Sequence, residues 1–392
     1  MRPLVPLAAL AVALSLAPAA ASASCGGPFP AFIAGLKAEA LAKGYDKAAV
    51  DAFFRTAAQD PAVLRADRGQ GVFRMGFTEF ARRLISQNRM TAAQTNAARH
   101  KAVFDRARRD YGVPPGILLA FWAFETDFGA VQGNFNTLNA LVTLAHDCRR
   151  PDLFRPQVFA ALEMARRGMF DPARTTGAWA GEIGMVQMLP TEIIRRGVDG
   201  DGDGRIDLNR SVPDSILTAA RKLKELGWRA GEPILVEAVV PADMDWSRSG
   251  IDKDFAVSDW AGMGVRPRSG TVPGGLRASL LLPEGRRGPA FLAFPNFKVL
   301  FEWNKSFVYV TTAAYFAARI EGAPVFDPGR PETGLGVEDM RALQTKLRAR
   351  GHDVGAIDGI LGALTRAAVQ KEQMRLGLPA DAWPTPALLS RL

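Results

Sequence analysis

One helical segment, apolar along its whole length, most constrains the fold of this 392-residue chain. Pro114 and Pro115 precede the run Gly116-Ile-Leu-Leu-Ala-Phe-Trp-Ala-Phe124, and proline suits the first position of a helix. Because the run is apolar around its full circumference, it predicts a helix that is buried on every side. Gly129 is the predicted end of this helix. Residues 29–104 repeat apolar side chains at three- and four-residue spacing, which predicts further helices before it.

The second half of the chain is expected to change from helices to strands and back. Helices are predicted at 155–167, 214–226 and 309–320, and strands at 233–240 and 278–282, with Gly- and Pro-rich turns between the strands. A Pro- and Gly-containing stretch at 324–336 predicts a linker, and 337–392 has three short helical patterns. The expected fold class is therefore α+β and mainly helical.

Composition excludes several kinds of site. The chain has three histidines and two cysteines, which are too few for a multi-histidine metal centre, a zinc ribbon or an iron–sulfur cluster. The formal net charge of +9 favours an anionic partner. The absence of any basic run with interleaved aromatic residues argues against nucleic acid.

The first 23 residues predict that the protein is exported from the cytoplasm. Arg2 is followed by an apolar run from Leu4 to Leu16 and a small-residue cleavage site at 21–23, so residues 1–23 are expected to be a signal peptide. The alternative, a membrane anchor, would need about 20 apolar residues. In an oxidising compartment Cys25 and Cys148 are expected to form a disulfide. Two free thiols are the alternative, and lipid attachment at Cys25 is not expected.

Glu125 lies at the end of the predicted buried helix, in Phe121-Trp-Ala-Phe-Glu-Thr-Asp-Phe-Gly129. Burial would raise the pKa of its carboxyl group and keep it protonated near neutral pH, as a general acid requires. Asp127, two residues later, would face another direction on a helix. Taken alone, the motif also fits an ordinary solvated glutamate.

The segment Asp199-Gly-Asp-Gly-Asp-Gly-Arg-Ile-Asp207 matches a calcium-binding loop. Acidic residues stand at positions 1, 3, 5 and 9, and glycine at position 6 permits the sharp turn. The predicted ligand residues are Asp199, Asp201, Asp203 and Arg205. Arg210 occupies position 12, where such loops carry a bidentate glutamate, so weak affinity is expected. An acidic turn without a metal is the alternative.

Two further motifs are weaker indications. Residues 181–191 combine glycines with a lone glutamine, Gln187, which suits a polar ligand but also fits a tight turn before a helix. Residues 303–309 place an aromatic ring beside Asn304, Ser306 and Tyr309. That arrangement suits a sugar, and it also fits a helix cap beside core aromatics.

In this order, and after a signal peptide, these motifs resemble the periplasmic lytic murein transglycosylases of the membrane-bound lytic transglycosylase B type. The resemblance covers about residues 25–323 and implies a lysozyme-like catalytic domain at 24–323 with a small β subdomain. It implies that Glu125 is the single acid and base of the reaction. The substrate-binding residues that it implies are Gln187, Arg149, Arg150, Asn304 and Tyr309. The acidic loop matches the family's structural calcium loop.

The reaction implied by the resemblance is cleavage of the β-1,4 bond between N-acetylmuramic acid and N-acetylglucosamine in peptidoglycan. No water is consumed, the new end is a 1,6-anhydro ring, and no catalytic cofactor is needed. Ala178 and Arg221 depart from the family's usual residues. A muramidase that hydrolyses the same bond is the nearest alternative, and it would need a second carboxylate. A non-catalytic wall-binding protein is the other alternative.

The C-terminal segment, 337–392, carries a second resemblance. Its Ile357-Asp-Gly…Gly362-x-x-Thr-x-x-Ala-Val369 pattern is similar to that of three-helix peptidoglycan-binding domains. Leu343, Leu347 and Val369 are expected to form its small core. The expected protein is a periplasmic, soluble monomer whose partner is the glycan strand of peptidoglycan, with no transmembrane segment in the mature chain.

Overall fold

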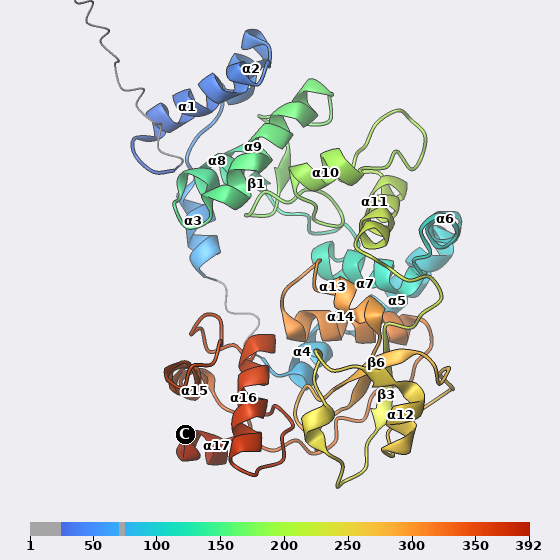
Figure 1. Ribbon diagram of the computed structural model, residues 1–392. Coiled ribbons are helices and arrows are strands. Elements are labelled where there is room, and N and C mark those ends of the chain that lie inside the picture. The colour runs from blue at the N-terminus through green and yellow to red at the C-terminus, as the bar shows by residue number, and fades with distance from the viewer. Residues whose placement is uncertain (1–24, 70–74) are drawn as a thin grey trace, which may run out of the picture.

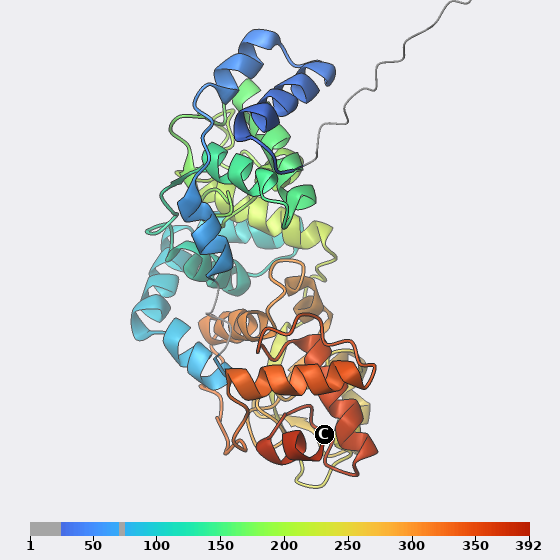
Figure 2. The same cartoon turned by 90° about the vertical axis from the view of Figure 1, so that its left-hand side faces the viewer.

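The computed structural model describes residues 25–69 and 75–392, so the predicted signal peptide lies outside the described residues. The chain is mainly helical and elongated, with α1 and α2 at one end and α15–α17 at the other (Figures 1 and 2). The N-terminal helices are α1 (Phe29–Ala42), α2 (Lys47–Phe54), α3 (Pro61–Arg68), α4 (Phe77–Leu84), α5 (Gln87–Arg99) and α6 (Lys101–Tyr111). The central helices are α7 (Pro115–Thr126), α8 (Thr137–His146), α9 (Pro151–Arg166), α10 (Pro190–Arg196) and α11 (Val212–Glu225).

Helix α7 is the apolar helix expected from the sequence, and it is buried from Gly116 to Ala123. Pro115 is its first residue, as predicted. The helix ends at Thr126 and not at Gly129, because Asp127 (φ 51°) and Phe128 (φ 58°) already adopt left-handed backbone conformations. Helix α14 (Phe307–Ile320) lies against α7 (Figure 1). Glu125 therefore lies in the last turn of a helix that packs against other helices.

The strands form a small subdomain, as expected from the second half of the chain. Strands β4 (Phe255–Ala256), β6 (Arg277–Leu281), β7 (Phe291–Ala293), β3 (Leu235–Val239) and β5 (Arg266–Pro267) form one antiparallel sheet in that order. Helices α12 (Val257–Gly262) and α13 (Pro295–Leu300) and a 3-10 turn (Trp246–Arg248) accompany the sheet. A second, two-stranded sheet pairs β1 (Phe135–Asn136) with β2 (Thr176–Gly177). Trp260, fully buried, donates its indole N–H to the carbonyl of Ala278 and is central to the subdomain core.

The C-terminal domain contains the three predicted helices, α15 (Val337–Ala349), α16 (Ala363–Arg375) and α17 (Pro386–Arg391). Leu343, Leu347 and Val369 form its core, as expected. The domain is docked on the rest of the chain through Arg366, whose guanidinium donates to the backbone carbonyls of Leu282 and Pro283. The same guanidinium lies 4.6 Å from the ring centroid of Phe307, the first residue of α14.

The predicted linker, 324–336, is packed against the protein along much of its length. Phe326 is buried, with its ring centroid 5.2 Å from that of Phe77 and 4.9 Å from that of Tyr315. Further along, Glu332 pairs with Arg286 and accepts a hydrogen bond from Trp383 through its backbone carbonyl. The sequence predicted a linker, and apolar and charged contacts hold this linker in place.

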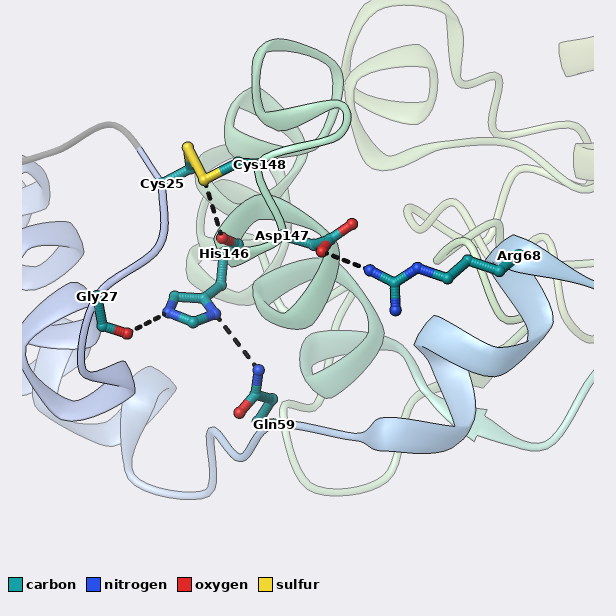
Figure 3. Close-up of a disulfide and its surroundings, with 7 residues drawn as sticks. All are labelled: Cys25, Gly27, Gln59, Arg68, His146, Asp147 and Cys148. Atoms are coloured by element: carbon teal, nitrogen blue, oxygen red, sulfur yellow. Dashed lines mark hydrogen bonds and ion pairs between the residues drawn. A yellow bond between two sulfur atoms is a disulfide. The ribbon is translucent and has the colours of Figure 1, made fainter.

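A disulfide joins Cys25 to Cys148, as predicted, across 123 residues (Figure 3). Free thiols and a lipid on Cys25 are therefore both excluded, because each sulfur is bonded to the other. His146 reinforces the attachment: its ring bonds the carbonyl of Gly27, and its own carbonyl accepts from the N–H of Gly26. No helix among the described residues is long and apolar enough to cross a membrane.

Candidate active site

Glu125 accepts hydrogen bonds from two donors, one on the segment just before α14 and one in the first turn of α14. The indole Nε1 of Trp303 donates to Glu125 Oε1 at 3.0 Å, and the Tyr309 hydroxyl donates to the same oxygen at 2.5 Å. Because both donors use Oε1, a proton on this carboxyl group belongs on Oε2. Helix α14 sets the position of Tyr309, since its N-cap Ser306 accepts a hydrogen bond from the Tyr309 backbone N–H.

Aromatic packing fixes the two donors. The rings of Phe121 and Trp303 stack with centroids 4.1 Å apart and planes 5° from parallel. Phe124 meets the Tyr309 ring edge-on at 6.0 Å. Both phenylalanines belong to α7, so the helix that supplies the acid also supplies the surfaces that hold its partners. Burial in this apolar setting raises the pKa of Glu125, and the donors Tyr309 and Trp303 oppose that rise by stabilising the anion.

Lys222 adds a positive charge on the other face of Trp303. Its ammonium lies 4.7 Å from the indole ring centroid and 3.6 Å from a carboxylate oxygen of Glu192. Burial lowers the pKa of Lys222, and its charge in turn lowers that of Glu125. Lys222 belongs to no sequence motif and was not predicted, because only the packing of α11 in the folded chain brings it near Glu125.

Gln187 lies in the loop that faces the end of α7. The Thr126 hydroxyl donates to the carbonyl of Met185 at 2.6 Å, which ties the loop to the residue after Glu125. Gln187 has a left-handed backbone (φ 50°), and its amide donates to the carbonyls of Gly184 and Gln132. The segment is thus the tight turn that one interpretation predicted, and its bond to Thr126 joins the loop that carries Gln187 to the residue after Glu125.

Arg149 and Arg150 both form ion pairs with one buried carboxylate, that of Asp67. Arg149 Nε donates to Asp67 Oδ2 at 2.7 Å, and Arg150 Nη2 pairs with the other Asp67 oxygen. The two guanidinium groups hold the pKa of the Asp67 carboxyl below its usual value although burial opposes them. Asp67 belongs to no sequence motif and was not predicted, and the role of the two arginines as substrate contacts remains a prediction.

Asn304 stabilises the turn before α14. Its side-chain oxygen accepts the backbone N–H of Ser306 at 2.8 Å, and Ser306 is the N-cap of the helix. The cap interpretation is therefore correct for Ser306 and not for Asn304 itself. Asn304 is half-buried between Trp303 and the start of α14, so its amide nitrogen stays a candidate substrate contact.

Asp127 turns away from the candidate site. Its carboxylate, half exposed, accepts from Arg89 Nε at 2.9 Å. The expectation that it would not be the second carboxylate is consistent with this geometry. A different acid, Glu182, is affected by the charge of Glu125: burial raises the pKa of Glu182 to about 7, and the negative charge of Glu125 adds to that rise. Residues 181–191 were singled out for their glycines and Gln187, and Glu182 within them was overlooked.

The acidic loop brings three carboxylates together. Ligand oxygens of Asp199, Asp201 and Asp203 lie within 4.8 Å of one another. Backbone N–H groups also stabilise the loop, since Asp199 accepts hydrogen bonds from those of Gly202 and Gly204. The fit to a calcium ion is good for these carboxylates, because hard oxygen ligands converge on one point at an exposed turn.

Arg205 and Arg210 take part in the loop through their backbone groups. The backbone N–H of Arg205 donates to Asp203, which leaves the Arg205 carbonyl as the predicted ligand atom. Arg210 contributes a backbone N–H to Asp207 and no side-chain oxygen. A bound ion would therefore have to complete its shell with backbone carbonyls and water.

A lysozyme-like helical domain with a single held glutamate, joined to a small three-helix domain, defines the class of protein. The transglycosylase SLT domain family matches residues 28–318, and the peptidoglycan-binding domain family matches residues 336–392. The chain therefore belongs to the SLT transglycosylase family and carries a peptidoglycan-binding domain, as the sequence resemblance indicated.

Individual relatives agree with this assignment. The chain is 32% identical over 212 residues to membrane-bound lytic murein transglycosylase B of Escherichia coli K12, an alignment that spans 54% of this chain and 58% of that protein. SltB3 of Pseudomonas aeruginosa, solved with NAG-anhNAM-pentapeptide, superimposes with a TM-score of 0.85 at 36% identity, covering 93% of this chain and 99% of that one. Slt35 of Escherichia coli, solved with calcium, gives a TM-score of 0.65 at 27% identity over 76% of this chain and 96% of that one.

Proposed function

We propose that the chain is a periplasmic, monomeric lytic transglycosylase that cleaves the bond between N-acetylmuramic acid and N-acetylglucosamine in peptidoglycan, with Glu125 as acid and then base. The observation that carries the proposal is the Glu125 carboxyl group, half-buried at the end of α7 with a raised pKa and with both donors on Oε1. The relatives' complexes with peptidoglycan fragments support the choice of substrate.

In the first half of the reaction, Glu125 donates its Oε2 proton to the glycosidic oxygen, and the bond from that oxygen to C1 of the muramic residue breaks. The acetamido oxygen of the same residue stabilises the positive charge that develops at C1. Tyr309 and Trp303 stabilise the carboxylate that remains, because hydrogen bonds to a charged acceptor are the stronger ones.

In the second half, the Glu125 carboxylate removes the proton of the muramic C6 hydroxyl, and O6 bonds to C1. The ring that closes is the 1,6-anhydro sugar, and Glu125 regains its proton. No water or cofactor enters these steps. Gln187, Asn304, Arg149 and Arg150 are proposed to contact the glycan and its carboxylates, and the net positive charge of the chain favours such an anionic polymer.

The products distinguish this function from its alternatives. Wild-type protein incubated with purified murein sacculi is expected to release fragments whose muramic ends are lighter by one water than those of a hydrolase, as measured by mass spectrometry. Reducing ends would indicate a muramidase. Pelleting with sacculi without any soluble product would indicate a wall-binding protein.

We also propose that the loop at 199–207 binds a structural calcium ion, which would brace the connection between α10 and α11 and take no part in the chemistry. Calcium is expected to raise the melting temperature of wild-type protein, with a stabilisation of about 2.7 kcal/mol at a free concentration near 100 times the Kd. Asp203→Asn keeps the acceptor for the Arg205 N–H but loses a ligand charge, so this shift should shrink or vanish. Asp171→Asn, outside the loop, is the control. Equal shifts in all three proteins would contradict the site.

A further inference from the structure

Lys222 is a cation beside the candidate site that the proposed reaction does not use. It lies in α11, and only 14% of its side chain is exposed. Its ammonium group has three neighbours: Glu192 Oε2 at 3.6 Å, Met188 Sδ at 3.8 Å and the Trp303 indole, whose ring centroid is 4.7 Å away. Because an ammonium group has three N–H donors, these neighbours leave little of it open to a bound glycan.

The Trp303 ring lies between Lys222 and Phe121, and its edge reaches the candidate acid. Phe121 stacks on one face of the indole, with centroids 4.1 Å apart and planes 5° from parallel. A ring stacked so closely leaves the opposite face for the ammonium group of Lys222. The indole Nε1 donates to Glu125 Oε1 at 3.0 Å. A continuous series of printed contacts thus joins Lys222 to Glu125 through one ring.

A cation over an indole ring affects both the position and the chemistry of that ring. The electron-rich face attracts the cation, which fixes the ring. The charge also draws electron density from the indole, which makes its N–H a stronger donor. A hydrogen bond to a carboxylate is stronger than one to a protonated carboxyl group. An interaction that strengthens as the proton leaves Glu125 lowers the barrier to that step and adds little to binding of the intact substrate.

The pairing of Lys222 with Glu192 has another cation to share it. Arg196, in α10, forms ion pairs with Glu192 of its own helix and with Glu225 of α11. Arg196 therefore already joins the two helices. The connection between α10 and α11 does not depend on Lys222, whose distinctive contact is the one with Trp303.

We propose that Lys222 is a positioning residue for the proposed reaction: its ammonium group holds the Trp303 indole against Glu125 and strengthens the N–H bond to the Glu125 carboxylate. The inference rests on the proposed function of Glu125. In this role Lys222 touches neither the glycan nor the acid. It acts once the glycosidic oxygen has taken the proton, when the negative charge on Glu125 is greatest.

The electrostatic surroundings agree in sign with this role. The groups that act on Glu125 are Tyr309, Trp303 and Lys222, and Glu182 responds to its charge. The groups that act on Lys222 are Glu192, Arg196 and Glu125. Burial raises the pKa of Glu125 and lowers that of Lys222, and the attraction between the two charges opposes both shifts. Removing the Lys222 charge should therefore raise the pKa of Glu125 further.

Kinetics on a soluble murein glycan fragment of defined length test the role. Lys222→Met keeps the length of the side chain and removes its charge. We expect kcat to fall about tenfold at unchanged KM, an effect within the range of a desolvated cation–π contact. Lys222→Gln, a second neutral variant, should show the same loss, and Lys222→Arg, which keeps a cation over the ring, should recover most of kcat. Lys224→Met, at an exposed position of the same helix, is the matched control and should keep the wild-type kcat.

The pH profile separates this role from a contact with substrate. Activity falls as the pH rises through the pKa at which Glu125 loses its proton. Without the Lys222 charge, Glu125 keeps its proton to a higher pH, so this alkaline limb of kcat/KM should move to higher pH in Lys222→Met. The deficit relative to the wild type should accordingly be smaller above the limb than below it. A raised KM with the limb unmoved would contradict the proposal and would make Lys222 a substrate contact.

The contact with Trp303 can also be tested without substrate. The indole 1H–15N signal of Trp303, assigned by its loss in Trp303→Phe, reports the strength of the N–H bond. We expect this signal to shift upfield in Lys222→Met, because the bond weakens, and to stay in place in Lys224→Met. An unchanged indole signal in folded Lys222→Met would overturn the proposal, as would equal losses of kcat in Lys222→Arg and Lys222→Met.

The two readouts keep this inference distinct from the proposed function. If the indole signal shifts but wild-type protein releases no anhydro product, the proposed function fails and the contact between Lys222 and Trp303 stands. If anhydro product forms and folded Lys222→Met keeps the wild-type kcat, only the present inference fails.

Discussion

Glu125→Gln is expected to lower kcat for release of soluble glycan by about 10³-fold while the protein still folds and binds sacculi. Glutamine keeps an oxygen for the Tyr309 and Trp303 donors and replaces Oε2 with an amide that cannot deliver a proton. The loss corresponds to about 4 kcal/mol of transition-state stabilisation. Mass-spectrometric quantification of products against time measures it. Near-wild-type kcat in the variant would rule out Glu125 as the acid.

The same substitution has an expected effect on stability that depends on pH. Because the pKa of Glu125 is raised in the folded protein, the folded state holds a proton that the unfolded state releases above its ordinary pKa near 4.5. Folding stability therefore falls as the pH rises from that value through the folded pKa. The melting temperature of Glu125→Gln relative to wild type should accordingly be higher at about pH 8 than at about pH 4. Glu302→Gln, an exposed glutamate beside Trp303, is the control and should show neither effect.

Removing the disulfide is expected to cost about 2–5 kcal/mol of unfolding free energy. The bond closes a loop of 123 residues between the start of α1 and the end of α8, and cross-linking so long a loop restricts the unfolded chain strongly. Chemical denaturation of a Cys25→Ser, Cys148→Ser double variant measures the cost. The bonds of His146 to Gly26 and Gly27 remain in the variant and should keep α1 in place at low denaturant.

Reduction provides the control for this prediction. A thiol reductant should lower the denaturation midpoint of the wild type toward that of the double variant and should leave the variant unchanged. The chemistry at Glu125 should survive in both proteins, since neither cysteine contacts the candidate site. Identical midpoints for oxidised wild type and the variant would mean that the hydrogen bonds of His146 alone secure the N-terminus.

The sequence predicted best what depends on local pattern. The buried helix α7, its proline start and the acid at its end follow from an unbroken apolar run, and the calcium-type loop follows from spacing alone. The predicted end of α7 was three residues too late. Asp127, a residue type that tolerates a left-handed backbone, ends the helix before Gly129 is reached. The disulfide could be predicted because the chain has only two cysteines.

What the sequence did not predict are contacts between distant segments. Trp303 was interpreted either as a sugar-binding ring or as a core aromatic, and its N–H bond to Glu125, 178 residues away, was not predicted. Asp67, which pairs with Arg149 and Arg150, stood in a stretch with no recognised motif. Glu182 lay inside a motif, yet its raised pKa comes first from burial in the folded chain and then from the charge of Glu125, a residue 57 positions away. Pairings of this kind arise from tertiary packing and have no local periodicity.

The packed connection before the C-terminal domain has a mechanical consequence. A flexible tether would let a polymer gripped by one domain reach the other in many orientations, at an effective concentration set by tether length. Here Phe326 is buried, and Arg366 joins the C-terminal domain to the start of α14, the helix that carries Tyr309. A strand held by the C-terminal domain would thus be presented to Glu125 at one spacing and one polarity. The fold of the protein would then set the distance along the strand between the part bound by the C-terminal domain and the bond that is cleaved at Glu125.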